Sequence, residues 1–171
     1  MTLTTTAGST TADSYASLAA ADAFHTARGN TTWTGADALK EAALRRATAW
    51  LDGCYGQRWP GIPTYGRVQA LDWPRTYAAD CDGNAIDAVT IPPEVVTATC
   101  EAALRELVSP GSLSPDVTPG TAKVLTGVGS LSWTPLRSSA SPNDMTPTLT
   151  AVERALAGIV GSASVVRVVR A

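Results

Sequence analysis

Gln69-Ala70-Leu71-Asp72-Trp73-Pro74-Arg75 is the stretch that decides the fold prediction. The ring of Pro74 disfavours a helical backbone at Trp73, so the stretch is predicted to be extended. Leu71 and Trp73 then point to the same face of a short strand, and Pro74 stops that strand. Helical sequence patterns lie on both sides. We therefore predict that Leu71, Trp73, Pro74 and Arg75 form a structural clip, which anchors a short strand against the helices.

The length and net charge of the chain favour one domain without a strongly charged partner. The chain has 171 residues, 13 Lys and Arg, and 15 Asp and Glu, so its formal charge is -2. This balance gives no basic excess for nucleic acid or an anionic membrane. Cys54, Cys81 and Cys100 are odd in number and widely spaced, which predicts buried thiols instead of a disulfide framework. Without a signal-peptide pattern or a long apolar run, we expect a soluble protein made in the cytoplasm.

Helical periodicity and capping signals predict a mainly α fold. The expected fold is a small bundle of about four helices, with a small β-hairpin element and extended terminal arms. A strand over 71–73 is expected to pair with 85–91 across a turn at 80–84, and 123–133 alternates as a strand does. The predicted helices span residues 18–28, 36–52, 92–108 and 147–160.

Details of the helix ends and faces follow from individual residues. Ser17 is expected to cap the first helix, and Thr34-Gly35-Ala36-Asp37 resembles a capping box for the second. Gly53 is the expected end of the second helix. Leu39 belongs to its predicted buried stripe, whereas Glu106 belongs to the polar side of the third helix.

Composition divides the chain into a domain and two arms. Residues 1–13 are small and polar and are predicted to be a flexible N-terminal arm. Residues 14–161 are predicted to form a single helical domain, with mobile Pro/Ser/Gly-rich loops near 109–121 and 136–147. Residues 162–171 are rich in β-branched residues and are expected to form a C-terminal β-like arm.

No pattern of catalytic, metal-binding or cofactor-binding residues is found in the sequence. His25 is the single histidine and has no cysteine at ligand spacing, so we expect a surface or boundary histidine. Asp80 and Asp82 lie beside Gly83 and fit a turn better than a cation site. Nucleophile, phosphate-loop and zinc-protease motifs are absent. We therefore predict that the protein is not an enzyme and has no catalytic residue, no metal and no cofactor.

Single-strand nucleic-acid binding is an alternative that the aromatic residues keep open. Three places put tryptophan beside arginine, which could stack bases and hold phosphates. They are Arg58-Trp59, Trp73-Pro74-Arg75, and Trp133 near Arg137. The slightly negative net charge weighs against this alternative.

Four segments resemble the head-tail connector, or adaptor, proteins of long-tailed double-stranded DNA phages and gene transfer agents. The resemblance covers residues 14–108, and some relatives carry the label of a DnaT-like single-strand DNA-binding protein. The segments are Ser14-Tyr15-Ala16-Ser17-Leu18-Ala19-Ala20-Ala21-Asp22-Ala23-Phe24, Glu41-Ala42-Ala43-Leu44 through Ala47-Thr48-Ala49-Trp50-Leu51-Asp52, Gln69-Ala70-Leu71-Asp72-Trp73-Pro74-Arg75, and Ile91-Pro92-Pro93-Glu94-Val95 with Ala98, Ala102 and Ala103.

The resemblance implies a structural virion protein at the portal-tail junction. Its copies would form a homo-oligomeric ring, commonly a dodecamer, between the portal protein and a stopper or terminator protein on the tail side. Double-stranded DNA would pass through the lumen during ejection without sequence-specific binding, and mild acidity suits such a lumen. No membrane partner is implied.

The C-terminal segment is the candidate contact with the portal or a neighbouring subunit. A β-branched tail can add a strand to another sheet, although it can equally pair within its own domain. The candidate interface residues are Val165, Val166, Arg167, Val168, Val169 and Arg170.

Overall fold

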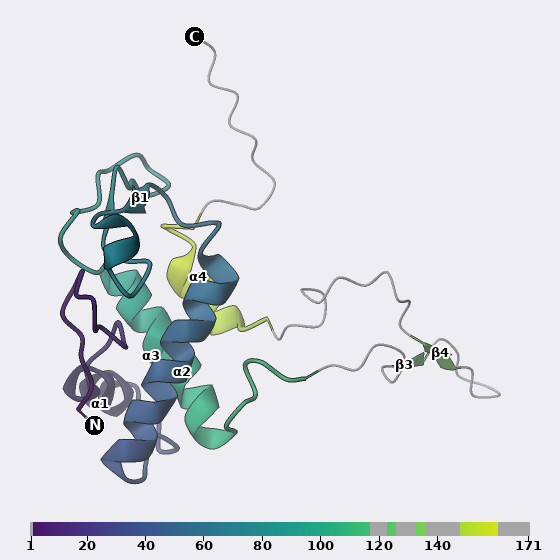
Figure 1. Ribbon diagram of the computed structural model, residues 1–171. Helices are drawn as coiled ribbons and strands as arrows, with labels where there is room; N and C mark the ends of the chain where they lie inside the picture. The colour runs from purple at the N-terminus through teal and green to yellow at the C-terminus, as the bar shows by residue number, and fades with distance from the viewer. Residues whose placement is uncertain (1, 117–122, 126–132, 136–147, 161–171) are drawn as a thin grey trace.

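The computed structural model describes residues 2–116, 123–125, 133–135 and 148–160, and within them the protein is mainly α (Figure 1). Two small antiparallel sheets accompany four α-helices in these residues, which confirms the predicted fold class. The elements are α1 (Leu18–Ala27), α2 (Asp37–Tyr55), β1 (Ile62–Pro63), the 3-10 helix η1 (Gly66–Val68), β2 (Arg75–Thr76), α3 (Pro93–Val108), β3 (Lys123–Leu125), β4 (Trp133–Pro135) and α4 (Thr150–Leu156).

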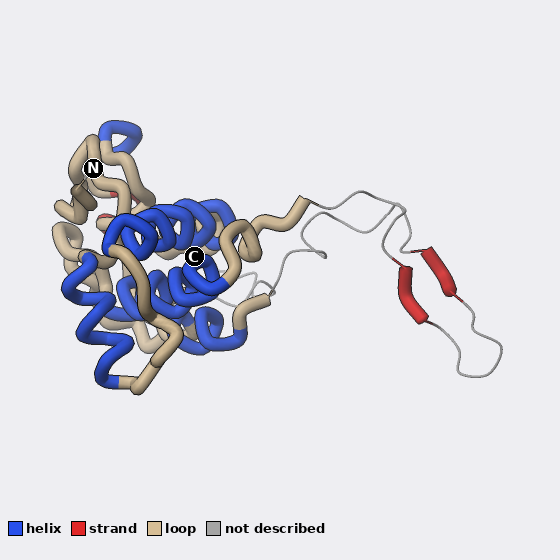
Figure 2. Tube along the Cα trace, turned by 90° about the horizontal axis from the view of Figure 1, so that it is seen from below, coloured by secondary structure: helices blue, strands red, loops and turns tan. Residues whose placement is uncertain are grey.

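The core lies between α2 and α3, which run antiparallel, and α4 packs against α3 (Figures 1 and 2). Alanines are fully buried on both central helices, including Ala43 and Ala47 on α2 and Ala98 and Ala102 on α3. Small side chains let helix backbones approach closely, and the larger core side chains fill the space around them. The alanine-rich composition therefore produces a tightly spaced helix pair.

The helix ends follow the sequence in part. Ser17 caps α1 as predicted, since its side chain accepts a hydrogen bond from the Ala20 amide at 3.2 Å. The predicted capping box of α2 is wrong, because the cap residue is Ala36 and no side chain bonds there. Gly53 does not end α2, which continues to Tyr55. Burial of the Tyr55 ring outweighs the roughly 1 kcal/mol by which glycine disfavours a helix.

The N-terminal segment lies against the domain. The Thr4 amide donates to the Asp13 carboxylate at 2.7 Å, and Arg45 donates to the same carboxylate at 2.6 Å. The Ala70 amide donates to the Ser9 carbonyl oxygen at 3.0 Å. Short polar side chains satisfy backbone groups locally, so a segment poor in apolar residues still gains an ordered path.

The predicted hairpin between 71–73 and 85–91 is wrong. Residues 71–73 form no strand; instead, β2 begins at Arg75 and pairs with β1, so that Ile62 faces Thr76. A single bridge joins Ala79 to Ala85. The physical reason is Gln69, whose side-chain amide donates to the Leu71 and Pro74 carbonyl oxygens at 2.6 and 3.2 Å. The Leu71 carbonyl group is thus occupied by a side chain, and the Pro74 carbonyl group also accepts from the Thr64 amide at 3.1 Å, so both are used away from residues 85–91.

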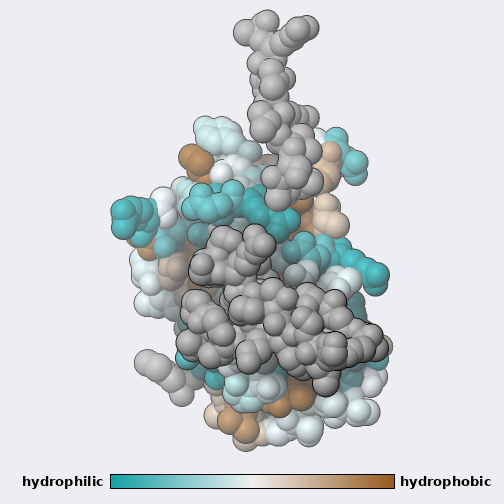
Figure 3. All heavy atoms as spheres, turned by 90° about the vertical axis from the view of Figure 1, so that its right-hand side faces the viewer, coloured by the Kyte–Doolittle hydropathy of each residue, from teal (hydrophilic) through white to brown (hydrophobic). Residues whose placement is uncertain are grey.

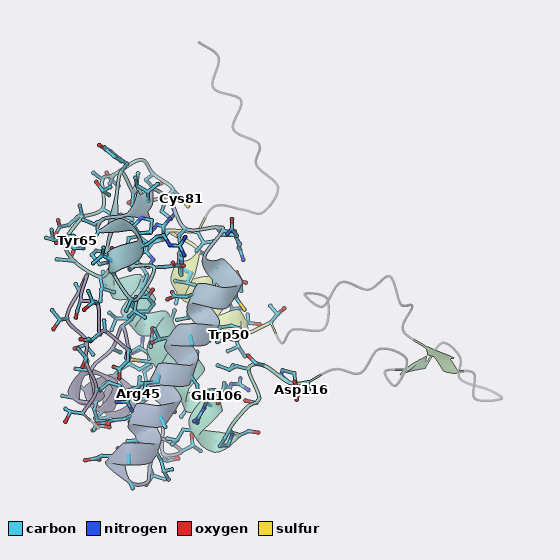
Figure 4. The ribbon with its side chains drawn as sticks, in the orientation of Figure 1. Arg45, Trp50, Tyr65, Cys81, Glu106 and Asp116 are labelled. Atoms are coloured by element: carbon cyan, nitrogen blue, oxygen red, sulfur yellow. The ribbon has the colours of Figure 1, made fainter. Side chains whose placement is uncertain are left out.

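Two predicted helix faces need correction. Leu39, expected in the buried stripe of α2, is 60% exposed. Glu106, expected on the polar side of α3, is 2% exposed and accepts from the Gly111 and Leu113 amides at 2.9 and 3.0 Å and from Arg46 at 2.6 Å (Figure 4). Burial raises the pKa of Glu106, but these three hydrogen bonds outweigh burial and hold the pKa below its usual value.

The cysteine and loop predictions have mixed outcomes. Cys100 is buried as expected, whereas Cys54 and Cys81 are exposed, and all three are free thiols. The exposure of Cys81 could not be predicted from helix or strand periodicity, because this residue lies in an irregular turn. Of the predicted loop near 109–121, residues 109–116 are described as turns, while 136–147 and the C-terminal arm 162–171 lie outside the described residues.

Replacing Trp73 tests whether the clip is part of the core. Trp73 is 1% exposed, and truncation of a buried aromatic leaves a cavity. We expect Trp73→Ala to lower the free energy of unfolding by about 3–5 kcal/mol, measured by urea unfolding. Val68→Ala is the control, because Val68 is 67% exposed. Equal small effects of both substitutions would contradict a core role for Trp73.

Candidate interaction surface

The clip residues are positioned by aromatic packing at the end of α2. The Trp73 ring meets the Trp59 ring edge to face at 5.8 Å, and Trp59 packs on Tyr55 at 5.6 Å. Tyr55 in turn contacts Trp50 at 6.1 Å. Such aromatic pairs add stability beyond their buried area. The chain of rings attaches the clip to the last turns of α2.

Arg75 is a buried cation that holds nearby backbone segments through hydrogen bonds to their carbonyl oxygens. It is 6% exposed, and its guanidinium donates to the carbonyl oxygens of Pro60 at 2.8 Å, Gly61 at 2.8 Å and Asp72 at 3.2 Å. Burial lowers the pKa of Arg75, and the carboxylate of Asp72 acts in the opposite direction. Because its donors are used on the chain itself, Arg75 braces the clip and is not presented to a ligand.

A hydrogen-bond network joins the clip to α2 and to Tyr15, which lies in the segment before α1. The Tyr15 hydroxyl donates to the Asp52 carboxylate at 2.5 Å and accepts from the Trp73 amide at 3.2 Å. The Asp72 amide donates to the other Asp52 oxygen at 3.3 Å. Burial, together with the charge of Asp72 and against the hydrogen bond from Tyr15, raises the pKa of Asp52 to about 7. Burial also raises the pKa of Asp72.

Exposed apolar side chains gather around the clip. Seven large apolar residues are exposed in the described part of the chain, and five of them lie between residues 62 and 89. We call these five the apolar tip: Ile62, Tyr65, Val68, Tyr77 and Val89.

The segments that carry the apolar tip are joined by strand pairing and by a hydrogen bond from a side chain to the backbone. The pairing of β1 with β2 brings the region of Ile62 beside Thr76, next to Tyr77. The Thr64 hydroxyl donates to the Ala88 carbonyl oxygen at 2.6 Å, which brings Val89 near Tyr65. Tyr65 lies at the outer edge of the end of the molecule that carries β1 (Figures 1 and 4). The face in Figure 3 shows apolar residues only as separate spots among polar ones outside the grey atoms.

Tyr77 is the most unusual residue of the tip. Its φ is 58°, and among the described residues it is the one non-glycine with positive φ. It is also 87% exposed. The left-handed conformation costs a bulky side chain roughly 1–2 kcal/mol. Gly61 permits the turn from the opposite strand, because a Cβ there would lie 2.3 Å from the Thr76 carbonyl oxygen.

The predicted site residues are thus core residues and not surface residues. Trp73, Pro74 and Arg75 are buried, and Leu71 is partly buried against the core. The candidate interface Val165–Arg170 lies outside the described residues. The apolar tip was missed by sequence reasoning. Its tyrosines and β-branched residues carry no signal of exposure, because the same residue types fill strand interiors.

The pairs of aromatic and basic residues proposed for base stacking are buried or already in contact with other residues of the domain. Trp59 is 5% exposed, and Arg58 lies 5.0 Å over the Tyr55 ring. The side chain of Trp133 lies outside the described residues. A stacking platform built on Trp59 or Trp73 is therefore excluded by burial.

His25 is buried, so the expectation of a surface or boundary histidine is wrong. It is 1% exposed, stacks on Trp33 at 4.3 Å, and its Nδ1 lies 3.0 Å from the Asn30 amide nitrogen. Burial lowers the pKa of His25. These residues line an open depression of about 180 Å³ at the end of α1. The small size of the depression suits a surface hollow and not a substrate pocket.

Neither a metal cluster nor a membrane helix occurs in the described residues. No three His, Cys, Asp or Glu side chains there lie close enough to hold a metal ion. None of the helices described is long and apolar enough to cross a bilayer. Asp80 forms the predicted turn, since its carboxylate accepts from the Asp82 and Asn84 amides at 3.0 and 2.8 Å.

The described residues therefore define a small mainly α domain whose distinctive surface is an exposed apolar tip on a braced clip. The family described as "Putative DnaT-like ssDNA binding protein" matches residues 1–171, and the chain belongs to this family. The description agrees better with the alternative of single-strand binding than with the adaptor interpretation. Comparisons with curated proteins and with solved structures gave no match.

Proposed function

We propose that this protein is a structural virion subunit, a head-to-tail adaptor that docks on a protein neighbour through the apolar tip. The observation that carries the proposal is Tyr77, a strained aromatic side chain that is 87% exposed. The positive φ opposes folding stability, and the exposed ring gains little from burial in return. Residues held in rare backbone regions cluster at sites where function requires them.

The chemistry of the tip suits a protein partner. Exposed apolar side chains that lie close together on a surface mark interaction sites. Tyrosine is enriched in such interfaces because it has a large apolar body and a polar end. The clip holds the tip on a rigid base through Trp73 and Arg75, so docking would cost little ordering of the chain. A non-enzymatic role is part of the proposal.

The assembly follows the resemblance to head-tail connectors. Copies of the chain would form a homo-oligomeric ring, commonly of twelve, in the virion neck between the portal protein and the tail-side protein. Double-stranded DNA would pass through the ring, and the net charge of -2 is compatible with weak phosphate contact. The segment Val165–Arg170 is proposed as a second contact, by strand addition to the portal or a neighbouring subunit.

Single-strand DNA binding is the second candidate, because the family description names it. The tip offers a place for it that does not involve the buried tryptophans. Tyr65 is 50% exposed, Tyr77 is 87% exposed, and Arg67 lies on η1 between them in sequence. Exposed aromatic rings stack bases, and an arginine can hold a phosphate.

Removing the Tyr77 side chain tests the adaptor proposal. Tyr77→Gly relieves the positive-φ strain, so we expect thermal stability to be equal or slightly higher, by up to about 1 kcal/mol. We expect the variant to attach poorly to portal-containing heads, as judged by neck density in particle images. Leu39→Ser, which removes a 60% exposed side chain at the far end of α2, is the control and should attach normally. Normal attachment of a folded Tyr77→Gly protein would refute docking through the tip.

The C-terminal contact is tested by truncation before Ser164. The shortened chain should keep the melting temperature of the full chain and fail to join portal-containing heads, because strand addition needs Val165–Arg170. Circular dichroism checks the fold, and particle images check attachment. Normal attachment, or unfolding of the truncated chain, would show that the segment has another role.

A titration of a fluorescent single-stranded oligonucleotide at several salt concentrations tests the second candidate. Under the adaptor proposal we expect no binding at physiological salt. Under the second candidate the affinity should fall steeply with salt, and Arg67→Gln should reduce the slope by about one. Arg105→Gln, at an exposed position in the last turn of α3, is the matched charge control. Steep binding that depends on Arg67 would replace the adaptor proposal.

A further inference from the structure

The 3-10 helix η1 and the residue before it carry two residues of the apolar tip, Tyr65 and Val68. None of the three residues of η1 is buried, so η1 gains no stability from a side chain in the core. Such a short helix is also not stable by itself. Gln69 supports the backbone, since its side-chain oxygen accepts from the Tyr65 amide at 3.0 Å. The Tyr65 ring needs a separate support.

The N-terminal segment supplies this support at Gly8 and Ser9. A Cβ on Gly8 would overlap with the Cε2 atom of the Tyr65 ring and lie 2.6 Å from its Cδ2 atom, so the ring rests directly on the Gly8 backbone. The φ of Gly8 is 72°, a conformation that glycine adopts without strain. The Ala70 amide, which follows η1, donates to the Ser9 carbonyl oxygen at 3.0 Å. Two adjacent residues therefore contact both sides of η1.

The other end of this segment is tied to α2. The Thr4 amide donates to the Asp13 carboxylate at 2.7 Å, and the Asp13 amide donates to the Thr4 carbonyl oxygen at 2.9 Å, so residues 4–13 form a closed loop. The second carboxylate oxygen of Asp13 accepts from Arg45 on α2 at 2.6 Å. Arg45 and Tyr65 lie well apart in the molecule (Figure 4). The loop thus connects the middle of α2 to the tip.

We propose that residues 4–13 form a positioning strap, which holds the Tyr65 ring and η1 in the arrangement in which the apolar tip docks. Gly8 is then a positioning residue that acts through Tyr65, and Asp13 ties the strap to α2. A side chain that is held in place before binding loses less conformational freedom on binding, so the strap favours docking. This consequence for docking rests on the proposed function, whereas the hold of the strap on η1 does not.

Nuclear Overhauser contacts of the full chain test the seat of the Tyr65 ring. In the unmodified protein, the ring protons should show a contact to the Gly8 α-protons. Gly8→Ala puts a methyl group where the ring lies. Because Tyr65 is 50% exposed, the ring can swing outward, and its proton shifts should move toward those of an exposed tyrosine. Absence of the contact, or unchanged Tyr65 shifts in Gly8→Ala, would overturn the strap.

Gly29→Ala is the matched control for backbone strain. Gly29 has a φ of 65°, close to that of Gly8, but no other atom would lie within 4 Å of a Cβ there. The two substitutions thus impose similar strain, and only Gly8→Ala displaces the ring. The Tyr65 shifts should be unchanged in Gly29→Ala. Equal shift changes in both variants would show that strain and not the seat of the ring is responsible, which would overturn the proposal.

Hydrogen exchange tests the tie to α2 and also serves if Gly8→Ala does not fold. Asp13→Asn keeps the shape of the side chain but weakens the bond to Arg45. The protection factor of the Ala70 amide, relative to that of the Cys100 amide in the core, should fall on the order of tenfold. Asp82→Asn removes the same charge from an exposed turn and should leave the ratio unchanged. An unchanged ratio in Asp13→Asn would overturn the strap.

A double-mutant cycle on docking separates a positioning role of Gly8 from a merely structural one. The readout is the fraction of portal-containing heads with neck density. Gly8→Ala and Tyr65→Ala should each lower this fraction, and Gly8→Ala should have no further effect when Tyr65→Ala is present, because the displaced ring is gone. Additive losses would overturn the positioning role.

Failure of the strap and failure of the adaptor proposal give different results. Normal attachment of Tyr77→Gly would refute docking through the tip, and the Tyr65 shifts and the Ala70 exchange would still report the hold of the strap on η1. Unchanged shifts and exchange, together with poor attachment of Tyr77→Gly, would overturn the strap and leave the adaptor proposal standing.

Discussion

The packing of Trp73 against Trp59 is the contact on which the rest of the clip depends. The chain between η1 and β2 has almost no regular structure, so its backbone groups cannot satisfy one another in a ladder. Burying Trp73 draws this irregular chain onto the helices. Gln69 then donates to the Leu71 and Pro74 carbonyl oxygens, and Arg75 donates to the Asp72 carbonyl oxygen. An apolar anchor and two polar braces thus replace a sheet and make a loop rigid enough to carry an exposed surface.

The helices could be predicted from the sequence because their signals are local. Ser17 and Pro93 mark the starts of α1 and α3, and apolar spacing identifies each helix. The predictions that were wrong concerned residues whose environment depends on groups distant in the sequence. Glu106 is buried because Arg46 and two amides beyond α3 converge on it, and no periodicity within α3 carries that information. The partner of β2 likewise depends on Gln69, whose side chain occupies backbone groups of the predicted strand.

The candidate site was less predictable than the fold. The clip was found because proline and tryptophan have strong conformational and packing preferences, and its residues support the fold as predicted. Tyr77 could not be found, since its backbone conformation depends on the approach of Gly61 from the opposite strand. Asp52 was placed correctly on a helix, but its charge depends on Tyr15 and Asp72, which are near it only in the folded protein.

Glu106 has a consequence for the part of the chain that follows α3. Its carboxylate fastens the Gly111 and Leu113 amides to the end of the helix, and the Leu113 side chain is buried beside it. The chain therefore leaves the helices from one fixed position near residue 114. Any force applied to the segment beyond this position would be delivered to α3, and through the Arg46 ion pair to α2, before it reached the clip. A pull on the chain beyond α3 would therefore act first on the two central helices and only then on the clip.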